Sequence, residues 1–321
     1  MYKIEKPFNT FHLQVDDENK VFVKQYGNKK GIPIFSIHGG PGGFSSNKKT
    51  KKFNLKKFHL ITIDQRGCGK STPHLVVKNN NTDNLIEDIE KIRKHLNMKK
   101  FIITGGSWGA SLSLLYCIKY PKNIITYIVG SGSFFTTNSI WPKSVISMFP
   151  DKWEKFCSLI NISKKDLYNP SFALEKKICS TYFNKIKNND MKYIKSWFNF
   201  EHDLVYTKKQ NKKTKLNQQS IDLAFYESYY YSKNFFRPIN YIENNCSKIK
   251  DIKGYILHGR IDIICDYSES YIIHKKLPKS TLITTDDEGH WGSKSDKKLL
   301  NLLDDLANKL YNNRLKYYFN K

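Results

Sequence analysis

Residues 101–109, which read FIITGGSWG, decide the fold of this chain. The first four residues have the character of a short buried strand, and the pattern from Ser107 to Tyr120 predicts a helix. A serine between a strand and a helix lies on a sharp, strained turn, where side chains at positions 105 and 109 would clash, so both positions require glycine. The start of the helix also places backbone N–H groups beside the hydroxyl. The stretch therefore predicts that Ser107 is an exposed nucleophile.

On both sides of this stretch, short apolar runs alternate with segments of helical spacing. Such alternation is typical of an α/β protein with a mostly parallel sheet flanked by helices. The predicted strands are 21–23, 34–37, 59–64, 127–129, 255–258 and 281–284, and the predicted helices are 85–96, 268–276 and 299–315.

The alternation stops between residues 135 and 245, where aromatic residues and lysines are frequent. This segment includes a basic run at 208–215, which we expect to be solvated. We interpret the segment as a mostly helical insertion. The sequence thus predicts a core in two parts, 1–134 and 246–321, with a helical cap at 135–245.

A serine hydroxyl is a weak nucleophile and needs a base, which in turn needs an acid to orient it. In the strand–serine–helix arrangement these partners follow in the order Ser, Asp, His. Asp262 follows the predicted strand 255–258, and His290 follows the next strand. Active sites of parallel sheets lie at the carboxyl ends of the strands. We therefore predict Ser107, Asp262 and His290 as the catalytic residues, with His258 as a packed core residue and His38 as a structural one.

The glycine-rich loop at 38–43, which reads HGGPGG, follows another predicted strand. Because glycine has no Cβ, such a loop lets a backbone N–H group approach a substrate oxygen. We assign the oxyanion hole to the N–H groups of Gly40 and Trp108. A phosphate-binding loop is disfavoured, because no Lys-Ser or Lys-Thr pair follows and the loop does not open a helix.

The charge of the chain is strongly basic. Its 321 residues include 54 lysines and arginines against 29 acidic residues, for a net charge of +25. Nucleic-acid sites favour arginine, whereas here almost all basic residues are lysines spread along the chain. This pattern favours a solvated lysine-rich surface, so we expect no nucleic-acid partner.

Other features limit the classes to which the protein can belong. No apolar run approaches the length of a membrane span, and no secretory signal is visible, so we expect a cytoplasmic protein without a membrane partner. The six cysteines show no pair or Cys/His cluster at metal-binding spacing, so we expect no metal and no cofactor. The oligomeric state is left open.

Together these motifs resemble the proline iminopeptidase (prolyl aminopeptidase) family of α/β-hydrolases. The resemblance rests on HGGPGG at 38–43, DQRGCG at 64–69, GGSWG at 105–109 and HGRID at 258–262. It implies an α/β-hydrolase fold with a cap. It also implies removal of N-terminal proline from peptides, through an acyl-enzyme on Ser107 and without a cofactor.

The resemblance further implies a substrate-binding group in the cap. Such enzymes bind the free α-amine of the substrate with two cap carboxylates, which correspond here to Glu201 and Glu227, and Tyr231 is included in the same group. Physically, a buried ammonium needs paired carboxylates to offset its desolvation. The implied partner is a peptide with a free N-terminal proline.

Two other functions are kept open. The first is a related serine amidase, esterase or broader aminopeptidase on the same fold, which would still act when the amine of the substrate is blocked. The second, more remote, is a protein that binds nucleic acid or an anionic surface, whose binding would depend steeply on salt.

Overall fold

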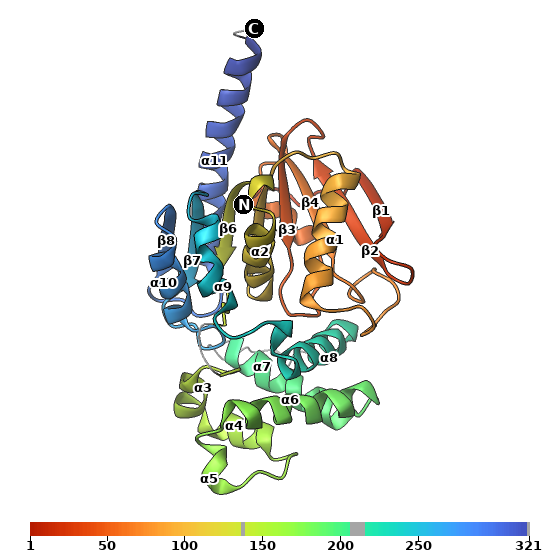
Figure 1. Ribbon diagram of the computed structural model, residues 1–321, viewed down its shortest axis with the longest axis vertical. Helices are drawn as coiled ribbons and strands as arrows, with labels where there is room; N and C mark the ends of the chain where they lie inside the picture. The colour runs from red at the N-terminus through yellow and green to blue at the C-terminus, as the bar shows by residue number, and fades with distance from the viewer. Residues whose placement is uncertain (136–138, 206–215, 320–321) are drawn as a thin grey trace.

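The computed structural model describes residues 1–135, 139–205 and 216–319, and these residues form an eight-stranded sheet (Figure 1). In space the strands lie in the order β1-β2-β4-β3-β5-β6-β7-β8. β1 and β2 pair antiparallel with their neighbours, and the strands from β4 to β8 are parallel. The strands are β1 (Asn9–Gln14), β2 (Lys20–Gly27), β3 (Ile32–Ile37), β4 (Phe58–Asp64), β5 (Phe101–Gly106), β6 (Ile124–Gly130), β7 (Gly254–Gly259) and β8 (Ser280–Thr285).

The mostly parallel sheet predicted from the sequence is confirmed, and every predicted strand is present. β1 was not predicted. It lies at one edge of the sheet, where it pairs only with β2, and none of its residues is fully buried. Such an edge strand needs no apolar run, so the sequence carries no clear signal for it.

Helices cover both faces of the sheet, because alternate residues of each strand point to opposite faces. On one face Phe35 and Ile103 pack in the core beneath α1 (Thr82–His95) and α2 (Trp108–Lys119). On the other face Ile34 and Ile102 pack in a smaller core with the first half of α11 (Ser293–Phe319). The short 3-10 helix η1 (Asn47–Lys52) lies against α11 on this second face.

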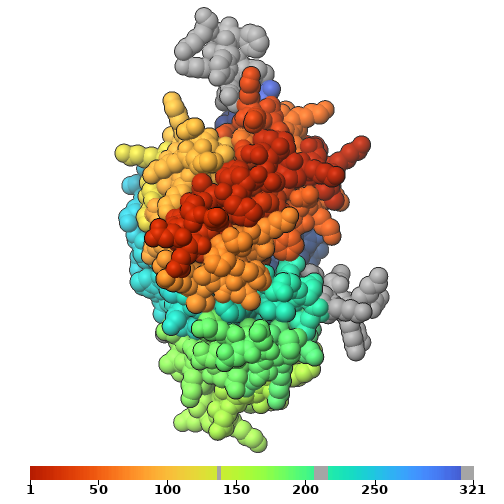
Figure 2. Space-filling model, turned by 90° about the vertical axis from the view of Figure 1, so that its right-hand side faces the viewer, coloured from red at the N-terminus to blue at the C-terminus, as the bar shows by residue number. Residues whose placement is uncertain are grey.

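The insertion between β6 and β7 is helical, as predicted, and forms a cap across the edge where the parallel strands end (Figure 1). The space-filling view shows the cap seated directly against the core (Figure 2). The cap helices are α3 (Lys143–Met148), α4 (Pro150–Cys157), α5 (Lys164–Leu167), α6 (Phe172–Lys187), α7 (Met191–Val205) and α8 (Gln218–Ser232). The boundaries of the cap at 135 and 245 stay predictions, and the basic run at 208–215 lies outside the described residues.

Aromatic side chains build the interior of the cap. The ring of Phe156 in α4 stacks on Tyr182 of α6 and on Phe200 of α7, with centroid distances of 4.5 and 4.2 Å. Trp153 and Trp197 are fully buried beside them. These residues explain why the segment is rich in aromatics: a small helical unit needs large side chains to bury enough apolar area.

The remaining elements are short links. η2 (Pro121–Asn123) joins α2 to β6, and α10 (Tyr267–Lys276) lies between β7 and β8. The elements that connect the cap to β7 are η3 (Asn234–Phe236), α9 (Tyr241–Asn245) and η4 (Cys246–Ile249). All six cysteines are buried and free. Across the described residues, none of the helices has both the length and the apolar character that crossing a membrane requires.

Candidate active site

Ser107 lies at the turn between β5 and α2, as predicted. Its backbone angles, φ 56° and ψ −132°, lie in a region that is strained for any residue other than glycine. A Cβ on Gly105 would lie 2.2 Å from the carbonyl oxygen of Gly109, and a Cβ on Gly109 would lie 2.6 Å from that of Ile37. Both contacts are far shorter than a side chain allows, so glycine is required on either side of the serine.

Asp262 and His290 follow β7 and β8, and the fold brings their side chains together. His290 Nδ1 lies 2.9 Å from Asp262 Oδ2. The second carboxylate oxygen, Oδ1, accepts the backbone N–H groups of Ile264 and Cys265, each at 3.0 Å. Burial disfavours the charge on Asp262, but the charge of His290 and the hydrogen bonds outweigh burial and hold the pKa of this carboxyl well below its usual range.

The contact with Asp262 sets the tautomer of His290. Because a carboxylate only accepts hydrogen bonds, Nδ1 carries the proton, and Nε2 is left to accept one. Burial opposes the charged ring, yet the Asp262 carboxylate, assisted by the charge of Glu201, raises the pKa of His290. Ser107 and His290 line one cavity, and within the described residues no hydrogen bond joins their side chains. Such contacts often tighten only when substrate binds.

His258 is buried, as expected from the sequence, but it also contacts Asp262. Its Nε2 lies 3.2 Å from Asp262 Oδ2 and 2.9 Å from the carbonyl oxygen of Cys265, and its Nδ1 lies 2.6 Å from Ser270 Oγ. His258 and His290 therefore contact the same carboxylate oxygen of Asp262. The close spacing of His258 and Asp262 in the sequence, at the end of one strand, could have indicated this contact.

The two amides assigned to the oxyanion hole lie in segments that Gln65 ties together. Gln65 donates its backbone N–H to His38 Nε2 and its side-chain amide to the carbonyl oxygen of His38, both at 2.9 Å. Its amide oxygen accepts the indole N–H of Trp108, also at 2.9 Å. For the backbone N–H groups of Gly40 and Trp108, no acceptor is found within the described chain. Gln65 was not predicted as a site residue, although it lies in DQRGCG, one of the motifs behind the resemblance.

Glu201 of α7 and Glu227 of α8 line one cavity of about 360 Å³, which we call the cap cavity. Trp197 Nε1 donates to Glu227 Oε2 at 2.7 Å, and Trp141 Nε1 donates to Glu201 Oε1 at 3.4 Å. Tyr231 lies beside this pair, with its ring 5.7 Å from that of Trp197. The structure thus groups all three of the predicted substrate-binding residues, and the two indoles were not foreseen.

The electrostatics of the cap cavity favour a cationic ligand. Burial raises the pKa of Glu201 to about 7. Burial, together with the negative charge of Glu201, raises the pKa of Glu227 well above its usual range. Two buried carboxyl groups in one cavity oppose each other's ionisation at neutral pH unless a positive charge lies between them. A bound ammonium would supply that charge.

A metal centre fits the site less well than a hydrogen-bonded pair does. Ligand atoms of Asp262, Cys265 and His290 lie within 4.8 Å of one another. However, Asp262 and His290 already bind each other. Burial also raises the pKa of the Cys265 thiol well above its usual range, which disfavours the thiolate that a metal needs.

Comparison with known proteins places the chain among hydrolases. A family model described as the alpha/beta hydrolase fold matches residues 32–156. The chain is 30% identical over 302 residues to a probable proline iminopeptidase from Leptolyngbya boryana, in a match that covers 90% of this chain and 91% of that protein. It is 29% identical over 302 residues to a proline iminopeptidase from Arabidopsis thaliana, in a match that covers 90% of this chain and 77% of the relative.

Solved structures agree on the fold. An esterase from Exiguobacterium antarcticum superposes with a TM-score of 0.64 at 15% identity, covering 92% of this chain and 98% of its own. A putative aryl esterase from Burkholderia cenocepacia superposes with a TM-score of 0.61 at 16% identity, covering 94% of this chain and 98% of its own. At such identities the likeness concerns the fold alone.

Proposed function

The chain belongs to the proline iminopeptidase family of α/β hydrolases, and from this premise we propose that it is a serine exopeptidase that releases N-terminal proline from peptides. The observation that carries the proposal is the pair of buried carboxyl groups in the cap, Glu201 and Glu227, close enough to His290 for Glu201 to raise its pKa. Such a pair suits a substrate with a positive charge, which would offset the burial of the two carboxylates.

In the proposed mechanism, Ser107 Oγ attacks the carbonyl carbon of the N-terminal proline. His290 Nε2 takes the hydroxyl proton, and Asp262 stabilises the imidazolium that forms. The backbone N–H groups of Gly40 and Trp108 stabilise the oxyanion. His290 then gives its proton to the leaving amine, so that the shortened peptide departs and the proline remains as an acyl group on Ser107. A water molecule, deprotonated by His290, releases it.

The cap carboxylates would set the substrate class. The secondary ammonium of an N-terminal proline bears one positive charge, and it loses its hydration when the cap covers it. Glu201 and Glu227 would offset that cost by direct ion pairing, while Trp141 and Trp197 hold the carboxylates in place. An amine that is acetylated carries no charge and would leave the two carboxyl groups buried without a cation.

The experiment that tests this role compares an amine substrate with an ester that has no amine. Glu201→Gln and Glu227→Gln are each expected to lower kcat/KM for proline 2-naphthylamide. The loss should correspond to about 2–5 kcal/mol of transition-state stabilisation, because the cation is then buried with half of its compensation. The loss on phenyl acetate is expected to be much smaller, so the ratio of the two kcat/KM values falls.

Glu154→Gln serves as the control, because Glu154 is an exposed carboxylate on cap helix α4. It should leave the ratio unchanged. Equal losses on both substrates in the Glu201 and Glu227 variants would mean that these acids support the fold, and no loss on either would remove them from the site.

A further inference from the structure

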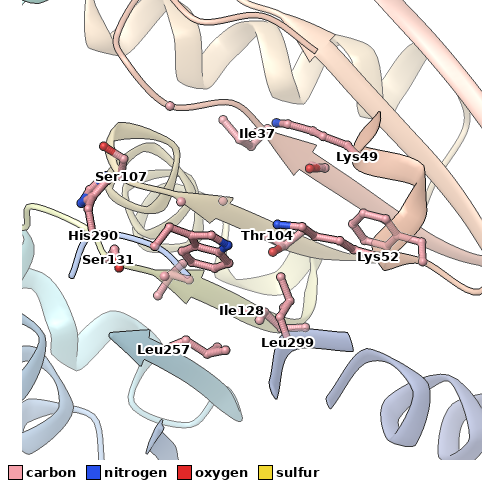
Figure 3. A pocket seen from close by; sticks show the side chains of 18 residues that line it. Ile37, Lys49, Lys52, Thr104, Ser107, Ile128, Ser131, Leu257, His290 and Leu299 are labelled. Atoms are coloured by element: carbon pink, nitrogen blue, oxygen red, sulfur yellow. The ribbon is translucent and has the colours of Figure 1, made fainter. Parts of the chain in front are cut away.

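A second cavity, of about 300 Å³, begins at the catalytic serine and lies over strands of the sheet (Figure 3). Ser107 and His290 lie at one end of it, and Lys49 and Lys52 of η1 enter from another side. Trp291 also lines it. We call it the lysine-lined cavity. All of its lining residues are described, and none of them is an aspartate or a glutamate.

The two lysines differ in how their charges are compensated. Lys52 pairs with Asp296, with Nζ 2.5 Å from Oδ1, and its Nζ lies 4.8 Å from the centre of the Trp291 ring. Among the described residues, Lys49 Nζ has neither an ion pair nor a hydrogen bond. Burial, together with the nearby charge of Lys52, lowers the pKa of Lys49 to about 8 despite the opposite influence of Asp64. At pH 7 it is still mainly a cation, and no carboxylate lines the cavity with it.

The two cavities have opposite charges. The cap cavity is lined by two carboxyl groups, and the lysine-lined cavity by two amines. His290 links the two, because it lines the lysine-lined cavity and responds to the charge of Glu201. A ligand that spans both would carry a positive charge at one end and a negative charge at the other. A short peptide with free termini has this distribution.

We propose that Lys49 binds the C-terminal carboxylate of the leaving residue, so that the lysine-lined cavity selects dipeptides of the form Pro-X over longer or C-terminally blocked peptides. The proposal rests on the proposed function, since it uses the same serine and base. A volume of about 300 Å³ is at the lower end of small-molecule sites and suits one amino-acid residue rather than a long chain.

The test compares Pro-Ala with Pro-Ala amide at pH 7 in the wild type, Lys49→Gln and Lys48→Gln. Lys48 is the matched control, because it lies next to Lys49 in η1, is exposed and does not line the cavity. The wild type is expected to prefer the free carboxylate in kcat/KM on the order of tenfold, mainly through KM. Lys49→Gln should bring that preference close to one, Lys49→Arg should keep part of it, and Lys48→Gln should leave it as in the wild type.

Three results would overturn the proposal. They are a wild type that does not prefer the carboxylate, a Lys49→Gln variant that keeps the preference, and a Lys48→Gln variant that loses it equally. The last result would assign the preference to the general positive charge of the surface rather than to the lysine-lined cavity.

A second pair of substrates separates this proposal from the proposed function. 3-Acetoxybenzoate and 3-acetoxybenzamide are esters without proline or amine, and they differ only in the charge of the leaving group. If proline peptides are not cleaved but the wild type prefers the benzoate and Lys49→Gln does not, the exopeptidase function fails and the carboxylate site stands. If proline peptides are cleaved and neither substrate pair shows a Lys49-dependent preference, the carboxylate site fails alone.

Discussion

At the scale of single residues, the proposed role of His290 connects the chemistry of the serine with the charge of the cap. In the proposed mechanism His290 must be neutral to accept the Ser107 proton, so activity should fall as pH drops through the pKa of His290. Although burial lowers this pKa, Asp262 and Glu201 raise it more, so the acidic limb of kcat/KM lies above about 6.5, the usual value for histidine.

The influence of Glu201 on His290 predicts the direction in which the acidic limb of the pH profile moves. Glu201→Gln removes a negative charge that favours the imidazolium, so the acidic limb should move to lower pH. The profile is measured with phenyl acetate, whose hydrolysis involves no substrate amine. Glu154→Gln, at an exposed cap position, should leave the limb in place. A limb that stays fixed or moves to higher pH in Glu201→Gln would contradict the coupling.

The sequence predicted the site residues that local patterns indicate. Ser107 follows from its strand-turn-helix context, and Asp262 and His290 follow from their order after successive strands. It did not identify the polar contacts that hold these groups, such as those of His258 and Gln65. Such contacts depend on which loops meet at the edge of the sheet, and a single sequence gives no distance between them.

At the scale of elements, the turn between β5 and α2 depends on close backbone packing. Gly105→Ala would place a Cβ 2.2 Å from the carbonyl oxygen of Gly109, whereas the atom nearest to a Cβ on Gly106 is 3.6 Å away. Gly105→Ala should therefore lower the free energy of unfolding by about 1–3 kcal/mol, because the backbone must shift. Gly106→Ala should change it by less than about 1 kcal/mol.

Urea unfolding followed by tryptophan fluorescence measures both variants. Equal stabilities for Gly105→Ala and Gly106→Ala would show that the turn tolerates a side chain at position 105. The glycines of the motif would then not be explained by packing around the serine.

The elements themselves were predictable to different degrees. Parallel strands buried on both faces read as continuous apolar runs, so β3 to β7 were found from the sequence. β8 was also predicted, although only one of its residues is fully buried. The edge strand β1 has no such run and was missed. In the cap the helical character was predicted, but the packing of α7 against α8 that brings Glu201 and Glu227 together was suggested only by the resemblance to a family.

At the scale of the whole molecule, the core and cap divide the work of the site. The core supplies a rigid sheet whose carboxyl edge carries Ser107, Asp262 and His290, and the cap adds carboxyl groups over that edge. The net charge of +25 does little to compensate the two acids in the cap cavity, because lysines on the surface are screened by water and salt. The proposed function therefore depends on the cap cavity and not on the overall charge.

The most direct test of the central claim is hydrolysis of three naphthylamides, those of proline, alanine and acetyl-proline, by one preparation of the protein. The account predicts rapid cleavage of proline naphthylamide, slower cleavage of alanine naphthylamide, and at least about a hundredfold loss in kcat/KM when the amine is acetylated, because the cap carboxylates then lack their cation. Ser107→Ala should lower kcat on the order of 10⁴-fold or more. Cleavage of acetyl-proline naphthylamide as fast as the free amine, or substantial activity in Ser107→Ala, would contradict the account.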